Sequence, residues 1–185
     1  MRLILLHLAL IVTFGIVLPL RKGIEFLDPV ITSAYACMGV IFAAPAAAMQ
    51  FAKGRPQSLK EVFARAAQAA GYGEGLALIL LAGGVAAVNL GRRGRWRWPE
   101  IDTLAGSAGL GLVATITMAL LAGWITLRFS RSAAQNWMRI LLVLLLLAFL
   151  YHSQSLPELA WPGAALCAAL AGVTIYLLHR EVNPR

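Results

Sequence analysis

The chain has 185 residues, of which 60% are apolar and only 13% are charged, and its formal net charge is +8. Because a soluble domain usually has about a quarter charged residues, this composition excludes an ordinary soluble globular protein. The positive charge is concentrated in short gaps between long apolar segments, which indicates an integral membrane protein rather than a nucleic-acid-binding protein.

Six apolar segments have the length of membrane-spanning helices or approach it. A helix that crosses a bilayer needs roughly 20 mostly apolar residues. The segments are expected at residues 3–20, 29–51, 72–90, 103–127, 136–152 and 159–178. We therefore predict an all-α integral membrane protein, a polytopic bundle of about six transmembrane helices. It should form a single domain over residues 1–185, with no soluble domain.

The first two segments carry recognisable start signals. The first follows Arg2 and looks like a signal peptide, but no small-residue cleavage site closes it, so we interpret it as an uncleaved helix. The second starts at Asp28 and Pro29, a favoured N-cap residue followed by a favoured first helical residue. Pro45 lies inside this segment and is expected to kink it.

A short amphipathic helix is expected between the second and third segments, at about residues 58–70. Ser58 and Glu61 have the S-x-x-E spacing of a capping box, and apolar and basic side chains then separate onto two faces. Such a helix fits the membrane interface. The alternative is a connector that packs on the protein itself. The third segment, residues 72–90, is expected to cross the bilayer, and the alternative is that it dips in and returns.

The distribution of basic residues predicts the orientation. With six crossings both termini lie on one side, where the gaps hold ten Lys and Arg residues against six on the opposite side. Because Lys and Arg favour the cytoplasmic side, both termini are expected in the cytoplasm. Arginine outnumbers lysine thirteen to three, which favours a bacterial source and hence a bacterial inner membrane.

The gap at residues 91–102, GRRGRWRWPEID, combines arginine with tryptophan. Tryptophan rings favour the membrane interface, and arginine stems can lie along apolar surface while the guanidinium groups reach lipid phosphates. We therefore predict contact with anionic lipid headgroups, and the acidic loop of a partner protein is the alternative. The residues concerned are Arg92, Arg93, Arg95, Trp96, Arg97 and Trp98.

Small residues recur every four positions in the third, fourth and sixth segments. They are Gly71, Gly75, Gly83, Ala87, Ala105, Gly109, Ala164, Ala168 and Gly172. This spacing lets helix backbones approach closely in a bilayer. We predict that the second, third, fourth and sixth segments form the packed centre, and that the first and fifth face lipid or a partner. The same stripes could instead form a dimer face.

Ionisable residues inside a membrane segment indicate function, because a charge in lipid is costly. No Asp, Glu, Lys or Arg is expected near the middle of a segment, which disfavours a proton-coupled pump or an intramembrane hydrolase. Glu74, about one turn into the third segment, and Asn89, near its end, are the candidate contacts for a solute or ion. The alternatives are a carboxylate favoured by a helix N-terminus and an amide that bonds a neighbouring helix.

Cofactor and metal sites are not expected. Cys37 and Cys167 lie in apolar segments without CxxC or zinc-binding spacing, and the sequence has no P-loop, HExxH or dinucleotide-binding motif. The histidines lie near segment ends, where they fit interface anchoring better than metal or haem ligation. They are His7, His152 and His179.

These features favour a non-catalytic subunit or scaffold of a larger membrane complex, for example a transport complex. The alternative is a small transporter or permease component for a neutral or apolar solute, which could act as a homodimer. A lipid-modifying enzyme ranks third, with loop residues Asp28, Arg95, Glu100 and Asp102 as its candidate groups. The expected partners are anionic membrane lipids and other membrane proteins or a second copy, with no nucleic acid.

Overall fold

The computed structural model of the chain describes residues 9, 11–91, 95–152 and 156–182. The side chains of Thr103, Arg131, Arg139, Leu142, residues 145–152, Leu156 and Pro157 are not described. All secondary structure within these ranges is helical, as predicted. Four helical stretches are long and apolar enough to cross a membrane: Pro29–Phe51, Leu59–Leu90, Leu104–Arg128 and Glu158–Val182.

Two of the six predicted crossings include residues that the structure does not describe. Residues 3–8 and 10 of the first crossing, residues 3–20, lie outside the description, as do the side chains of residues 139, 142 and 145–152 of the fifth, residues 136–152. His7 and the side chain of His152 also lie there. The number of six crossings therefore stays a prediction.

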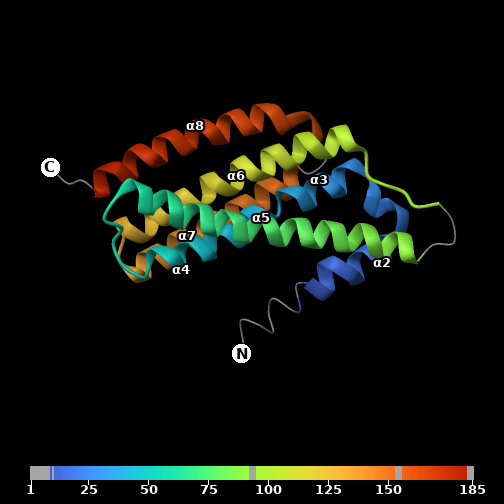
Figure 1. Cartoon of the computed structure of the whole chain (residues 1–185), viewed down its shortest axis with the longest axis horizontal. Coiled ribbons are helices and arrows are strands. Elements are labelled where there is room, and N and C mark those ends of the chain that lie inside the picture. The colour runs from blue at the N-terminus through green and yellow to red at the C-terminus, as the bar shows by residue number, and fades with distance from the viewer. Residues whose placement is uncertain (1–8, 10, 92–94, 153–155, 183–185) are drawn as a thin grey trace.

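The described elements follow one another as a series of antiparallel passes along one long axis (Figure 1). They are the π-helix η1 (Thr13–Val17), α2 (Leu18–Lys22), the 3-10 helix η2 (Gly23–Leu27), α3 (Pro29–Cys37), α4 (Gly39–Phe51), α5 (Leu59–Leu90), α6 (Ile101–Arg128), α7 (Arg131–His152) and α8 (Leu156–Val182). Helix α6 is central, because it packs against α3, α4, α5, α7 and α8.

Side-chain contacts fix the directions of the passes. Ser33 bonds Ser107, and Phe51 packs on Gly123, so α3 and α4 run in the same direction as α6. Helix α5 runs the opposite way, since its residue 74 lies at Gly39 and its residue 65 lies over Phe51. Helix α8 runs parallel to α6, because Ala160 lies at Gly106 and the Thr117 hydroxyl donates to the Cys167 carbonyl.

The predicted interfacial helix at residues 58–70 is not a separate element. Ser58 caps the helix as predicted, with its Oγ accepting from the Glu61 N–H at 3.3 Å, but α5 then continues unbroken to Leu90. At 32 residues it is about 48 Å long, which exceeds the ~30 Å hydrocarbon core of a bilayer. Its first turns bury Val62 and Ala66 against α4 and α6, so packing on the protein itself, the alternative interpretation, is what the structure has.

The second predicted segment is interrupted, but about two turns before Pro45 rather than at it. Helix α3 ends at Cys37 and α4 begins at Gly39. Around this point the N–H groups of Met38 and Ile41 bond to carbonyls only three residues earlier. A proline ring has no N–H and crowds the carbonyl four residues before it, here that of Ile41, so the direct effect of Pro45 falls inside α4 and not at Met38.

The packed centre differs from the prediction in one helix. In the apolar windows of Pro29–Phe51, Leu59–Leu90 and Leu104–Arg128, 56% of the residues are buried, whereas in Glu158–Val182 only 11% are buried. Helix α8 therefore lies at the periphery, along α6 (Figure 1). The described part of the first segment packs on the protein as well, since the Tyr35 hydroxyl donates to the Phe14 carbonyl at 2.7 Å.

Candidate functional site

Glu74 lies halfway along α5, not at its N-terminus. The sequence suggested a position about one turn into a segment that starts at residue 72, but the helix begins at Leu59, four turns earlier. Thr115 is at the middle of α6, and the interruption at Met38 and Gly39 is close to the middle of Pro29–Phe51. The three meet at one level of the bundle, so the helix-terminus interpretation of Glu74 is wrong.

The Glu74 carboxyl group is enclosed by the three helices. Only 9% of the residue is exposed, and its Oε2 accepts a hydrogen bond from the buried Thr115 hydroxyl at 3.2 Å. A Cβ at position 39 would overlap both this carboxyl oxygen and the Thr115 hydroxyl oxygen. Gly39 therefore provides the space in which the two groups meet. We call Gly39, Glu74 and Thr115 the central site.

Two further glycines hold the interrupted backbone. A Cβ at Gly73 would overlap the carbonyl oxygen of Gly39 and the backbone of Ala43, and a Cβ at Gly111 would overlap the carbonyl of Ala36. Glycine allows this approach because it has no side chain. The interruption is thus held between α5 and α6 by direct contact between backbones.

Buried polar groups extend from the central site toward one end of the bundle. Ser33 and Ser107 are fully buried and bond to each other at 2.7 Å, and the Cys37 thiol donates to the Ser107 carbonyl at 3.7 Å. Ser107 and Thr115 are eight residues apart, on one face of α6. Toward the other end, α4, α5 and α6 meet through a cluster of apolar residues that includes Ala43, Ala47, Phe51, Met118 and Ala122.

This arrangement limits the chemistry that the central site can perform. No cationic side chain of the described residues forms an ion pair with Glu74, and a carboxylate without a partner inside a membrane is costly. A bound proton or a hydrogen-bond donor from a ligand would lower that cost. The described residues contain no group of three or more His, Cys, Asp or Glu residues that could hold a metal ion.

Asn89 does not join Glu74. It lies fifteen residues further along α5, about 22 Å away. Its amide binds the backbone of Arg97, with Oδ1 accepting from the N–H at 2.7 Å and Nδ2 donating to the carbonyl at 2.9 Å, and Nδ2 also donates to the Val85 carbonyl at 2.8 Å. The structure thus assigns Asn89 a role in holding the loop, not in contacting a solute with Glu74.

The arginine and tryptophan gap lies at the end of the bundle where α5 leads into α6 (Figure 1). Arg92 and Arg93 lie outside the described residues. Residues 95–98 are exposed and non-helical, and the rings of Trp96 and Trp98 lie 6.0 Å apart between centroids. The prediction of headgroup contact stays untested.

The acidic residues named for a lipid-modifying enzyme lie at this same end of the bundle. Asp28 is occupied as the N-cap of α3, where Oδ1 accepts from the Val30 N–H at 2.8 Å. Glu100 and Asp102 are exposed at the start of α6. They are not enclosed as Glu74 is.

The predicted small-residue stripes mostly face away from the helix contacts. A Cβ added at Gly71, Gly75, Gly109 or Gly172 would meet no heavy atom of the described chain within 4 Å, and at Gly83 it would come only within 3.7 Å of the Gly15 carbonyl oxygen. Ala105 and Ala168 are exposed, and Ala87 and Ala164 are half-buried. The glycines at close contacts are instead Gly39, Gly73, Gly84, Gly111 and Gly123.

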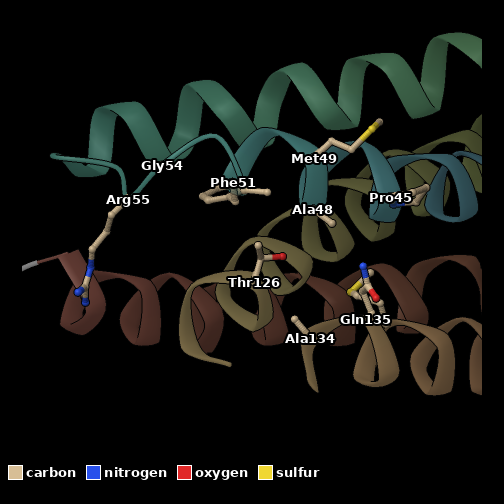
Figure 2. A pocket seen from close by; sticks show the side chains of 11 residues that line it. Pro45, Ala48, Met49, Phe51, Gly54, Arg55, Thr126, Ala134 and Gln135 are labelled. Carbon is tan, nitrogen blue, oxygen red and sulfur yellow. The ribbon is translucent and has the colours of Figure 1, made fainter. Parts of the chain in front are cut away.

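A cavity of about 630 Å³ lies between α4, α6 and α7, at the end of the bundle opposite to the arginine and tryptophan gap (Figure 2). Sequence analysis did not predict it, since it depends on how α7 packs. Its lining residues are Pro45, Ala48, Met49, Phe51, Ala52, Gly54, Arg55, Thr126, Ala134, Gln135 and Met138.

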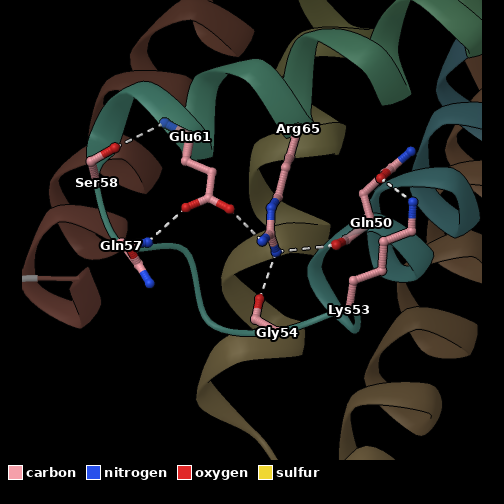
Figure 3. A network of polar contacts seen from close by, with 7 residues as sticks. All are labelled: Gln50, Lys53, Gly54, Gln57, Ser58, Glu61 and Arg65. Atoms are coloured by element: carbon pink, nitrogen blue, oxygen red, sulfur yellow. Dashed lines mark hydrogen bonds and ion pairs between the residues drawn. The ribbon is translucent and has the colours of Figure 1, made fainter.

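Polar contacts order the loop beside this cavity (Figure 3). The Arg65 guanidinium pairs with Glu61 and donates to the carbonyls of Gly54 and Gln50. Glu61 also accepts from the Gln57 N–H at 2.8 Å. The loop between α4 and α5 is thereby tied to the first turns of α5.

Comparison with known proteins gives no relative. No family model, no curated protein and no solved structure matches the chain. A function therefore has to be argued from the central site and its surroundings.

Proposed function

We propose that the protein is a small membrane transporter or permease component, in which Glu74 binds a proton together with a small neutral solute. The observation that supports this most directly is the position of the Glu74 carboxyl group, enclosed at the middle of three apolar helices. Ionisable groups in such a place commonly mark ion or substrate pathways. An interrupted helix beside a mid-membrane site is a recurring feature of transporters.

The polar groups around the site suggest the direction of access. Ser33, Ser107 and Cys37 connect Glu74 with the end that holds the arginine and tryptophan gap, and the opposite half of the interface is apolar. Hydroxyl groups can exchange hydrogen bonds with a passing ligand, whereas methyl groups cannot. We propose that the ligand reaches Glu74 from the side of the gap.

We propose six crossings in a bacterial inner membrane, with both termini in the cytoplasm. The parallel directions of α6 and α8 support this, because the chain between them has to return along the bundle. Helix α7 has 22 residues and is about 33 Å long, enough for that return. The end of the bundle that holds the arginine and tryptophan gap then faces away from the cytoplasm.

A proton-flux measurement tests the role of Glu74. The purified chain is placed in liposomes that contain a pH-sensitive dye, and a potassium diffusion potential drives the flux. We expect flux with the natural sequence, and at least a tenfold loss with Glu74→Gln, which keeps the size and removes the titratable group. Glu25→Gln, at an exposed residue of η2, is the matched control and should leave the flux unchanged. Flux that persists in Glu74→Gln, or that falls equally in Glu25→Gln, would contradict the proposal.

The second candidate function is a non-catalytic subunit or scaffold. It is favoured by the outward position of the small residues on α5, α6 and α8, such as Gly71, Gly109 and Gly172, where another membrane helix could approach closely. Purification of a tagged chain from its host in mild detergent, with mass analysis of co-eluting proteins, tests it. A stoichiometric membrane partner would support a subunit, and elution alone or as a homodimer would contradict it.

A further inference from the structure

The cavity between α4, α6 and α7 is an open groove with apolar walls. Ala48, Phe51, Ala134 and Met138 line it, and Met49 is exposed at its edge. Figure 2 shows Arg55 at one end of the groove and Pro45 with Gln135 toward the other. Its volume of about 630 Å³ is in the range of sites that bind small organic molecules.

The groove begins where the helices end. Phe51 is the last residue of α4, and Ala134 is in the first turn of α7. Pro45 lies six residues before the end of α4, about 9 Å deeper in the bundle. The groove thus covers the depth at which the headgroups and the first acyl carbons of one lipid leaflet lie.

Positive charge surrounds the end of the groove that lies where α4 ends and α7 begins. The described ends of the helices and the loop between α4 and α5 carry six cationic side chains on this side and only two anionic ones, Glu61 and Glu181. The six are Lys53, Arg55, Lys60, Arg65, Arg128 and Arg180. Arg55 donates from Nη2 to both the carbonyl and the carboxylate of Glu181. A guanidinium group has five N–H donors, so Arg55 can also bind a phosphate.

We propose that this groove binds an anionic phospholipid, with one acyl chain along Ala48 and Met138 and the phosphate at Arg55. Apolar walls suit the acyl chain, and the surrounding basic side chains complement the negative headgroup. This site is separate from the central site, so it does not depend on the function proposed for Glu74.

Native mass spectrometry of the full chain in mild detergent tests the proposal. The probes are phosphatidylglycerol and phosphatidylcholine with the same acyl chains. We expect phosphatidylglycerol to be retained at least fivefold more, since each nearby basic residue contributes about 1 kcal/mol of attraction. Equal retention of the two lipids would overturn the proposal.

Two pairs of variants test whether the lipid binds in the groove. Ala48→Trp fills the groove and should abolish the preference, whereas Leu166→Trp, on the exposed face of α8, should keep it. Arg55→Gln should lower phosphatidylglycerol retention about fivefold, whereas Arg21→Gln, exposed in the last turn of α2 at the opposite end of the bundle, should keep it. An Ala48→Trp or Arg55→Gln chain that retains the lipid like the natural sequence would overturn the proposal.

A second measurement covers the case in which Ala48→Trp does not fold. A ligand that binds the folded state raises the unfolding midpoint, so phosphatidylglycerol should raise the midpoint of the natural chain and not that of Ala134→Leu, which narrows the groove by a smaller change. An equal rise in both would overturn the proposal. A dimer that Ala48→Trp or Ala134→Leu dissociates would overturn it too, because the groove would then be a protein interface.

Discussion

Gly39 is the residue on which the geometry of the central site depends most. A methyl group there would overlap the Glu74 carboxylate and the Thr115 hydroxyl. We expect Gly39→Ala to lower the free energy of unfolding by about 1–3 kcal/mol, the usual cost of overpacking. Thermal unfolding in detergent measures it.

A second glycine provides the matched control for that change. Gly109 is also inside a helix, but a Cβ there would meet no heavy atom of the described chain within 4 Å. Gly109→Ala should be neutral, or stabilising by up to about 1 kcal/mol through helix propensity. Equal effects of the two substitutions would contradict the close contact at Gly39.

Asn89 carries a prediction of its own at the same scale. Asn89→Ala would remove the two hydrogen bonds that hold the Arg97 backbone, at a cost of about 1–3 kcal/mol for buried groups left unpaired. Trypsin should then cut after Arg95 or Arg97 about tenfold faster. Gln68→Ala, at an exposed position of α5, is the control and should not change the rate of cleavage. Unchanged cleavage in Asn89→Ala would show that the amide does not hold the loop.

At the scale of the elements, α5 has one feature that could be predicted from the sequence, its N-cap, and one that could not, its length. The cap at Ser58 was predicted because it depends on residues three apart in the sequence. The continuation of α5 through GYGEG, residues 71–75, was not predicted, since three glycines in five residues disfavour a helix by about 1 kcal/mol each. Contacts with α4, such as that of Gly73 with Gly39, outweigh this cost. The position of Glu74 halfway along α5 follows from that continuity, so it was missed as well.

The predicted small-residue stripes do not form the close helix contacts within the chain, for a related reason. In GYGEG, glycines occur at residues 71, 73 and 75, so either face of the helix offers a small residue. Spacing alone therefore does not decide which face meets a neighbour. In the structure Gly73 faces α4, and Gly71 and Gly75 do not.

A distance measurement tests whether α5 is one rigid helix. With Cys37 and Cys167 replaced by alanine, spin labels are attached at Ala64→Cys and Leu78→Cys, two exposed positions fourteen residues apart. One unbroken helix separates their backbones by about 21 Å, and we expect a single narrow distance distribution. A broad distribution, or a clearly shorter distance, would show a hinge at residues 71–75 and would move Glu74 back toward a helix end.

At the scale of the whole molecule, the directions of the helices constrain the topology more than hydropathy does. Hydropathy identifies apolar helices one at a time, and it does not show whether α7 crosses. The contacts between α8 and α6 show that both helices run in the same direction. The chain between them, which includes α7, therefore has to return along the bundle. In the six-crossing arrangement that we propose, Lys53 and Arg180 lie on the same side of the membrane, with four crossings between them.

Labelling of single cysteines tests this arrangement. In the chain without Cys37 and Cys167, a maleimide that does not cross membranes is added to spheroplasts. Trp98→Cys should react at once, whereas Lys53→Cys and Arg180→Cys should react only after permeabilisation, because the more basic side faces the cytoplasm. Reaction of Lys53→Cys and Arg180→Cys from opposite sides would mean that α7 does not cross. Reaction of both from outside, with Trp98→Cys protected, would reverse the orientation and the side from which we propose that a ligand reaches Glu74.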